Sequence, residues 1–301
     1  MIPTLAGVIL LVFFLFKYFG GDPAEILAGQ LASPQRIASI RQQLGLDRPT
    51  LEQLWVFTRH AVTFDWGRSW TTNEEISNIF RTRLPATLTI MVPILVLDMV
   101  LGTIAGMAVA YVRGSLADRA VMVITTLALS ISFLVYVIVA QYLFAFRLGW
   151  FPVQGWSNSL WTNLTVFTPL PVMLAVLVSL APNTRLYRTF FLDELGHDYV
   201  RTARAKGVPE QRVVFKHVLR NALIPILTNV ATQLPGIFIG SFLLEIFFSV
   251  PGLGREVYNA VNRSDYPVIQ AVTIYLAVIT MVINLLTDLL YKVVDPRVVF
   301  K

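Results

Sequence analysis

The chain of 301 residues contains no cysteine and only three histidines, His60, His197 and His217. The lack of thiols excludes disulfides, thiolate metal sites and cysteine nucleophiles. The histidines lack the His-Glu-x-x-His spacing of a metal-binding helix, so we expect no metal site. No Gly-Lys dipeptide occurs either, which excludes a phosphate-binding loop of the Gly-x-x-x-x-Gly-Lys type. We find no nucleophile, base and metal constellation of an enzyme.

Charge is also scarce, at 14% of residues against roughly 25% in soluble domains. Hydrophobic residues make up 55% of the chain, and the mean hydropathy is +0.66. The apolar runs are continuous rather than alternating, which favours helices over a barrel. Each is long enough to cross a hydrocarbon core. We predict an all-α integral membrane protein with six transmembrane helices, at 3–19, 86–112, 120–146, 164–184, 222–248 and 268–294.

Basic residues gather on one side of these spans. With the N-terminus inside, the inside connections 113–119, 185–221 and 295–301, together with Lys292, hold 13 of the 24 lysines and arginines. The two short outside loops hold only Arg147, Arg255 and Arg263. This bias predicts cytoplasmic N- and C-termini. It also explains the net charge of +6 better than nucleic-acid binding does.

The outside segment 20–85 has helical signals of its own. Ser33 and Pro34 are typical of a helix start and Gly45 of its end, and a second amphipathic stretch begins at Thr50. We therefore expect a small extracytoplasmic cap. Because no repeat or flexible linker is visible, the chain is described as one transmembrane domain, 1–301.

The inside segment 193–220 combines basic residues with a glycine corner. Gly207 ends one short helix, and Pro209 opens the next. Acidic residues precede the basic ones along the first helix, as the helix dipole favours: Asp193, Glu194 and Asp198 come before Arg201, Arg204 and Lys206. Leu195, Tyr199 and Ala203 share one face. The segment is either a loop that only fixes orientation or a docking element for another protein; its specified shape favours docking.

Several motifs carry a resemblance to a known family. DYVRTARAKG, HVLRNALIP, FSVPGLG, DYPVIQ and DLLYKVVDPR cover roughly 190–300, and GGDPAEILAG, QQLGLDRP and AYVRGSLAD extend over the first half. Together they resemble the permease subunits of ATP-binding-cassette importers for dipeptides, oligopeptides, nickel and related solutes, especially the first of the two paired permeases. The resemblance implies the type I importer permease fold with cytoplasmic coupling helices, in a bacterial inner membrane.

The resemblance also implies partners: a homologous second permease, two ATPase subunits that bind ATP and Mg²⁺, an extracytoplasmic solute-binding protein, membrane lipid and a peptide substrate. No cofactor is expected on this chain. In the family, the segment matching 193–220 is the coupling loop that docks on the ATPase. It departs from the general Glu-Ala-Ala and Leu-Pro pattern at Arg201-Thr202-Ala203 and Leu219-Arg220. By resemblance, ATPase coupling is assigned to Tyr199, Arg201, Thr202, Ala203, Arg204, Lys206 and Gly207.

Four charges lie inside apolar runs, at Lys17, Asp98, Glu245 and Asp288. Such charges are costly and call for a role. Lys17 can reach the interface, and Glu245 and Asp288 are interpreted as serving structural pairing or interfacial positioning. Asp98 either faces the transport pathway or is structural. In the fifth span, Asn229, Thr232, Gln233, Gly236 and Gly240 form a stripe that serves helix packing or lines the pathway. The Gly236-x-x-x-Gly240 and Gly102-x-x-x-Gly106 spacings are typical of close crossings.

The loop SVPGLGREVYNAVNRSDYP, 249–267, joins the last two predicted spans. It is either a solvated connector or, as the resemblance implies, the surface facing the solute-binding protein, with Pro251, Gly252, Leu253, Gly254, Asp265 and Tyr266 as its residues. A secondary transporter or channel is the rival hypothesis, but it predicts internal repeats that are not visible. The solute stays open among dipeptides, longer peptides, glutathione, nickel complexes and glycosides.

Overall fold

The computed structural model describes residues 2–29 and 32–294 and is helical, with no strand in those ranges. The chain divides into two compact units, unit 1 formed by Met1–Ala86 with Pro251–Lys301 and unit 2 formed by Thr87–Val250. The boundary falls within one long helix, α5 (Ile76–Tyr111). The all-α class is therefore as predicted, while the description as one domain stays a prediction.

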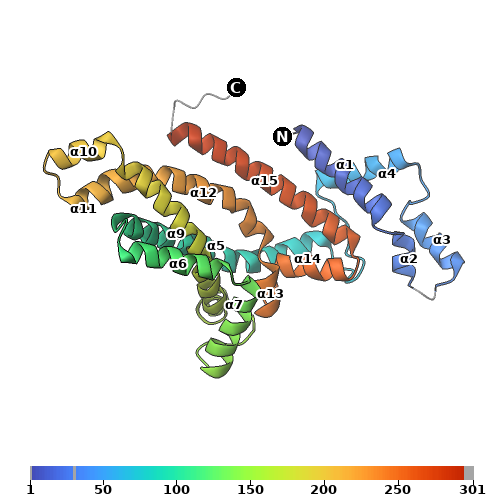
Figure 1. Cartoon of the computed structure of the whole chain (residues 1–301). Helices are drawn as coiled ribbons and strands as arrows, with labels where there is room; N and C mark the ends of the chain where they lie inside the picture. The colour runs from blue at the N-terminus through green and yellow to red at the C-terminus, as the bar shows by residue number, and fades with distance from the viewer. Residues whose placement is uncertain (1, 30–31, 295–301) are drawn as a thin grey trace. The chain divides into compact units, whose positions relative to one another are not determined.

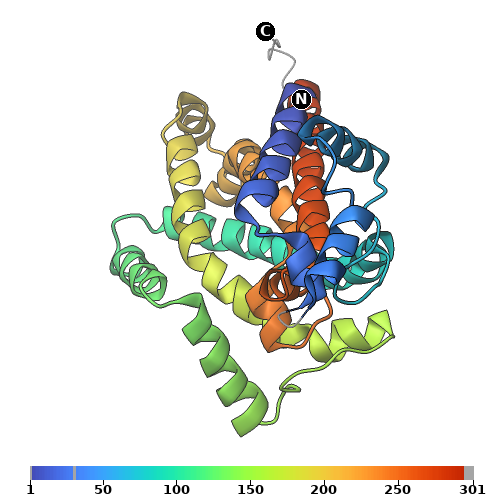
Figure 2. The same ribbon diagram turned by 90° about the vertical axis from the view of Figure 1, so that its right-hand side faces the viewer.

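Unit 1 contains the first helix, the predicted cap and the last helix (Figures 1 and 2). Its helices are α1 (Ile2–Phe19), α2 (Pro23–Ala28), α3 (Pro34–Gln43), α4 (Thr50–Thr63), the start of α5, α14 (Leu253–Asn262) and α15 (Tyr266–Val294). α1 lies along α15, and Ile9, Val12, Ala61 and Ile274 form a buried cluster of this unit. The predicted helix after Ser33 is confirmed, because the Ser33 hydroxyl accepts a hydrogen bond from the Arg36 N–H at 3.4 Å.

Unit 2 contains the rest of α5 and the helices up to residue 247. They are α6 (Leu116–Leu129), α7 (Phe133–Ala140), η1 (Gln141–Arg147), α8 (Leu160–Thr162), η2 (Asn163–Phe167), α9 (Pro169–Leu195), α10 (Asp198–Ala205), α11 (Glu210–Arg212), η3 (Val213–Val218), α12 (Leu219–Ile239) and α13 (Phe242–Phe247). The three η segments are π-helical. Leu170 and Tyr187 on α9, with Ile226 on α12, are among the most deeply buried large side chains of this unit.

Four helices of the described residues are long and apolar enough to cross a membrane. They lie at Ile76–Tyr111, Pro169–Leu195, Glu210–Ile239 and Tyr266–Thr287, and a bent pair formed by α6 and the α7–η1 segment makes a fifth if it is one span. α1 is apolar but shorter than these. Six spans therefore stay a prediction, while the class of membrane-spanning helical protein agrees with the structure.

Two predicted spans are not continuous helices. The run 120–146 is bent by 91° between α6 and the α7–η1 segment. The run 222–248 is interrupted at Gly240, whose φ of +76° lies in the left-handed region that favours glycine. Hydropathy alone missed both breaks because the flanking residues remain apolar through the turns.

The two predicted glycine crossings have different outcomes. A Cβ atom at Gly106 would lie 2.8 Å from the Tyr187 Cβ, and one at Gly102 would lie 3.1 Å from the Tyr187 ring, so α5 and α9 approach closely there. The crossing predicted at Gly102 and Gly106 is confirmed. The crossing predicted at Gly236 and Gly240 holds for one of the two residues. At Gly236, nothing lies within 4 Å of an added Cβ in the described chain, whereas one at Gly240 would lie 2.8 Å from the Thr87 side chain of α5.

Candidate functional site

The basic segment predicted as a corner is a helix, a turn and a second helix at one end of unit 2 (Figure 1). The turn follows α10. The Gly207 N–H donates to the Arg204 carbonyl at 2.9 Å, and the Val208 N–H donates to the Ala203 carbonyl at 3.2 Å. This pair of bonds is a Schellman motif, which needs a left-handed residue after the helix. Gly207 supplies it with a φ of +75°.

An ion pair closes the corner. The Arg204 guanidinium donates to both carboxylate oxygens of Glu210, with Nε to Oε2 at 3.0 Å and Nη2 to Oε1 at 2.6 Å. Its hydrogen bond to Glu210 is the main reason that the pKa of Arg204 is raised. A bidentate pair fixes geometry in two directions. Arg204 and Glu210 therefore hold the two helices at a defined angle on either side of Gly207.

A second contact ties α10 to the end of α9. The Tyr199 hydroxyl donates to Glu194 Oε2 at 2.5 Å. Burial, followed by this contact with the Glu194 carboxylate, raises the pKa of Tyr199 to about 12. Tyr199 therefore keeps its proton and its donor role at physiological pH.

The apolar face of α10 is buried within unit 2. Val200 is fully buried and Ala203 is 8% exposed, and both belong to one core cluster with Phe191 of α9. The other buried members of this cluster are Ala110, Tyr187, Val213, Val218, Ala222 and Ile226. Because these residues come from α5, α9, η3 and α12, α10 packs directly against three of the long helices.

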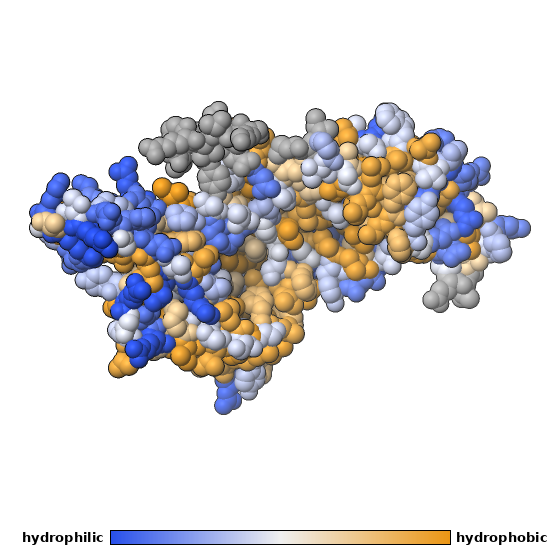
Figure 3. Space-filling model, turned by 45° about the horizontal axis from the view of Figure 1, so that its top comes forward, coloured by the Kyte–Doolittle hydropathy of each residue, from blue (hydrophilic) through white to orange (hydrophobic). Residues whose placement is uncertain are grey.

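The opposite face of α10 is exposed and basic. Arg201 is exposed and makes only a 3.4 Å contact with Asp198, and Thr202, Lys206 and Gly207 are also exposed. Hydrophilic residues gather over this end of unit 2 in Figure 3. The sequence-predicted coupling residues thus divide into three sets: Tyr199 and Ala203 face the core, Arg204 is paired with Glu210, and the other four are exposed.

Two details of the predicted segment were wrong. Asp193 and Glu194 lie in the last turn of α9, so α10 begins only at Asp198. Leu195 also belongs to α9 and does not share a helix with Tyr199. The predicted apolar face is turned inward because α10 must cover the end of the helices that it follows.

Sequence reasoning missed a contact near the turn 112–115. Arg188 on α9 donates to both oxygens of Asp118 at the start of α6, each at 2.8 Å, and the Gly114 N–H donates to the same carboxylate at 2.9 Å. The side chains are only 19% and 7% exposed. The one available signal was the motif AYVRGSLAD, which contains the turn and Asp118.

The structure places Asp98 between α5 and α9. Its carboxylate accepts a hydrogen bond from the Ser179 hydroxyl at 2.6 Å and another from the Asn183 amide, and the residue is 4% exposed. In the fifth predicted span, the Asn229 amide oxygen accepts from Gln233 at 2.8 Å and from the Tyr187 hydroxyl at 3.3 Å. Thr232 is exposed and donates to the Asn229 carbonyl at 2.7 Å.

The other intramembrane charges have structural partners where they are described. Glu245 is 1% exposed and accepts a hydrogen bond from the Thr87 hydroxyl at 2.9 Å. Lys17 donates to Thr50 and Gln53 on α4. The Asp288 side chain lies outside the described residues.

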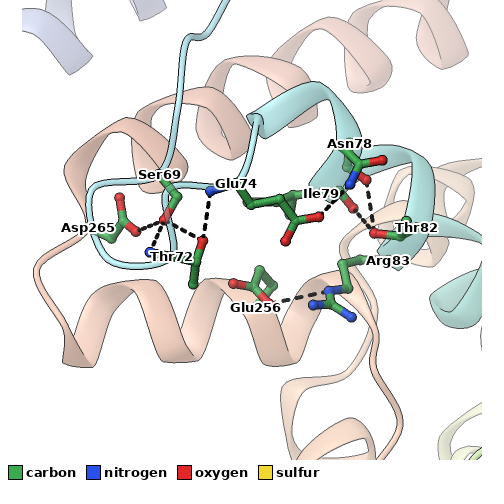
Figure 4. A network of polar contacts seen from close by, with 9 residues as sticks. All are labelled: Ser69, Thr72, Glu74, Asn78, Ile79, Thr82, Arg83, Glu256 and Asp265. Atoms are coloured by element: carbon green, nitrogen blue, oxygen red, sulfur yellow. Dashed lines mark hydrogen bonds and ion pairs between the residues drawn. The ribbon is translucent and has the colours of Figure 1, made fainter.

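The predicted binding-protein-facing loop is mostly the helix α14. Gly252, Leu253 and Gly254 are buried, and Pro251 and Tyr266 are half-buried. Asp265 is 3% exposed, and its carboxylate accepts from the Ser69 hydroxyl at 2.5 Å and from the backbone N–H groups of Trp70 and Thr71 at 3.1 and 3.2 Å. Figure 4 shows the contact between Asp265 and Ser69 and, nearby, the ion pair of Arg83 and Glu256, whose Nε and Oε2 atoms are 3.5 Å apart. Asp265 therefore fixes the turn before α5.

The fold and this site define a membrane-embedded helical protein with a basic corner and no nucleotide-binding motif. Two family models match it: binding-protein-dependent transport system inner membrane component over residues 99–300, and the N-terminal model of such membrane components over residues 2–91. The chain belongs to this family. It is a permease subunit of an ATP-binding-cassette importer and not the ATPase.

Curated relatives match over almost the whole chain. A Brucella abortus (strain 2308) protein, named for a peptide transport system permease, is 36% identical over 302 residues, covering 99% of this chain and 95% of the relative. The glutathione transport system permease protein GsiC of Salmonella typhimurium (strain LT2) is 36% identical over 304 residues, covering 100% and 96%.

Proposed function

We propose that this chain forms half of the membrane pathway of an importer for peptides, together with a homologous second permease. The names of the two relatives support a peptide or glutathione as the solute. Two ATPase subunits carry ATP and Mg²⁺, and a solute-binding protein delivers the peptide. The basic side of the membrane spans is cytoplasmic, which places both termini inside and segment 20–85 outside.

The observation that carries the coupling role is the two-sided helix α10. Its exposed face presents Arg201, Thr202 and Lys206, while Val200 and Ala203 on its other face pack into the core of unit 2. A partner bound to the exposed face can therefore move α5, α9 and α12. ATP shifts the permease between inward- and outward-facing states only if the ATPase binds the two states with different affinity. We assign this difference in affinity to contacts between the ATPase and the exposed face of α10.

Pathway lining is assigned to Thr232 first, because it is exposed on α12. Asn229 and Gln233 are half-buried and hydrogen-bonded to each other, so they support that surface. Asp98 is assigned a supporting role through Ser179 and Asn183. On α14, the exposed residues Tyr258 and Val261 are better placed to face the solute-binding protein than the buried Leu253, Gly254 and Asp265.

Affinity purification from the native membrane in mild detergent tests the assembly. Mass spectrometry of the eluate is expected to identify a second permease and ATPase subunits, and the eluate is expected to hydrolyse ATP. Recovery of the chain alone, with solute movement in liposomes that needs no ATP, would contradict the proposal.

A further inference from the structure

Unit 1 contains a cavity of about 880 Å³, and none of the residues assigned above to pathway lining contributes to its walls. The end of α1, the start of α15 and α4 contribute to its walls, together with the turns near residues 22, 45 and 67. α15 is long and apolar enough to cross a membrane, and α1 exposes Leu11 and Phe14 along its side. The cavity therefore lies where apolar helices end and polar cap residues begin.

Aromatic rings form part of the cavity wall. Tyr266 packs against Phe16 and Trp70, with ring centroids 5.2 and 5.7 Å apart, and Trp66 also lines the space. Tryptophan and tyrosine concentrate at the level of lipid headgroups, because their rings combine an apolar body with a polar edge. The wall chemistry therefore matches the membrane–water interface.

Lys17 provides a positive charge without a carboxylate partner among the described residues. Its ammonium donates to Thr50 Oγ1 at 2.9 Å and to Gln53 Oε1 at 3.1 Å, both neutral acceptors. Gln53 is held in this orientation because its own amide donates to the carbonyls of Leu46 and Arg48 at 2.9 and 2.8 Å. An ammonium has three donors, so one of them remains for a ligand.

Arg68 is the second cation of the cavity wall that has no carboxylate partner among the described residues. Its guanidinium donates to the carbonyl of Asn73 at 3.0 Å, which leaves its charge without a counterion among the described residues. Arg68 and Lys17 both line the cavity. Arg41 is paired with Asp22, so its charge is compensated.

Basic residues outnumber acidic ones in the lining, with Lys17, Arg41, Arg48 and Arg68 against Asp22 and Asp65. Asp22 accepts from the Ala24 N–H at 2.9 Å as well as from Arg41, and Asp65 lies 3.8 Å from His60 Nδ1. No further carboxylate lines the cavity. The lining therefore carries a net positive charge, and a ligand with only negative charge matches Lys17 and Arg68.

We propose that this cavity binds a phospholipid with an anionic headgroup. The phosphodiester lies between Lys17 and Arg68, and the acyl chains extend along α1 from Phe13 and Phe16, which line the cavity. The assignment to the outer leaflet rests on the proposed orientation, whereas the binding chemistry does not. The bound lipid joins α1, α4 and α15 and so fixes the cap above the membrane.

Native mass spectrometry of the full chain in its purified complex tests the proposal. Dioleoyl-phosphatidylglycerol and dioleoyl-phosphatidylcholine are added separately, and the anionic lipid is expected to bind about tenfold more tightly, the ratio that one charge-assisted hydrogen bond supplies. Lys17→Gln should remove about tenfold of the affinity, and Lys17→Arg should restore most of it. Arg59→Gln is the matched control, because Arg59 is exposed on α4 and does not line the cavity.

Several outcomes would overturn the proposal. These are equal binding of the two lipids, equal effects of Lys17→Gln and Arg59→Gln, displacement by inorganic phosphate or glycerol phosphate at the lipid concentration, and displacement by a di- or tripeptide. If Lys17→Gln fails to fold, Arg68→Gln carries the same test with the same expected loss. Because this experiment measures lipid binding directly, a negative result would contradict the lipid site but not the proposed partnership with the ATPase. Failure to recover the ATPase subunits would likewise not contradict the lipid site.

Discussion

Arg204 and Glu210 form a two-point ion pair across the Gly207 turn, so the angle between α10 and the helix that leads into α12 is fixed by side chains as well as by backbone. The pair is largely exposed, with 46% and 37% of the side chains accessible. Exposed pairs contribute about 0.2–1 kcal/mol to stability. The pair therefore mainly fixes the angle between the two helices and contributes little to the free energy of unfolding.

Exchanging the two residues separates these roles. Arg204→Gln and Glu210→Gln are each expected to lower ATP-driven uptake several-fold in reconstituted liposomes while changing the melting temperature little. The exchanged double variant, Arg204→Glu with Glu210→Arg, should recover much of the activity because the pair re-forms. If the exchange recovers nothing while Glu210→Gln alone is harmless, Arg204 acts by contacting a partner and not by fixing the corner.

The Gly207 turn predicts a difference between two substitutions. Nothing lies within 4 Å of an added Cβ, so the obstacle to a side chain is the φ of +75° alone. Gly207→Val should strain the turn by about 1–2 kcal/mol or more and strongly reduce uptake, whereas Gly207→Asn, which tolerates this conformation, should retain most of it. Both variants are expected in the membrane at normal levels by immunoblot. Normal uptake by Gly207→Val would show that the Gly207 turn is not needed for transport.

The crossing of α5 and α9 predicts opposite outcomes for two helical glycines. Gly106→Ala places a methyl group 2.8 Å from the Tyr187 Cβ and 2.9 Å from the Arg188 N, so we expect a loss of about 1–3 kcal/mol. Gly236→Ala enters open space on α12 and should be neutral or slightly stabilising. Thermal unfolding of the two variants in the same detergent measures this. Equal melting temperatures would show that the crossing is looser than described.

The bond between Arg188 and Asp118 predicts a stability effect away from the coupling surface. Arg188→Gln leaves the Gly114 N–H as the remaining described donor to a nearly buried carboxylate, and should lower the melting temperature by several degrees. Arg185→Gln is the control, since Arg185 is exposed and makes one contact at 3.4 Å. Equal effects of the two variants would argue that the pair is not structural.

The sequence allowed prediction of elements whose signals are local. Ser33 with Pro34, the left-handed turn at Gly207 and the long apolar helices all depend on residues a few positions apart, and the structure agrees with them. The break at Gly240 and the bend after Leu129 depend on packing against distant residues. The burial of Glu245, for example, is explained by its hydrogen bond from Thr87, which lies far earlier in the chain.

The same distinction applies to the candidate site. Gly207 and the exposed Arg201 were predictable from spacing and charge, but the inward direction of Ala203 was not. Its orientation is decided by η3 and the end of α9, which lie on either side of α10 in the chain. Asp265 was likewise assigned to a surface because its partners, in the turn 69–71, are almost 200 residues away.

A cross-linking measurement tests the central claim most directly, because the chain has no cysteine of its own to compete. Thr202→Cys on the exposed face of α10 is labelled with a maleimide photo-cross-linker in the assembled complex, beside Arg59→Cys on α4 as the control. The account predicts an adduct between residue 202 and an ATPase subunit, and none from residue 59. An intact complex in which residue 202 forms no ATPase adduct would contradict α10 as the coupling surface.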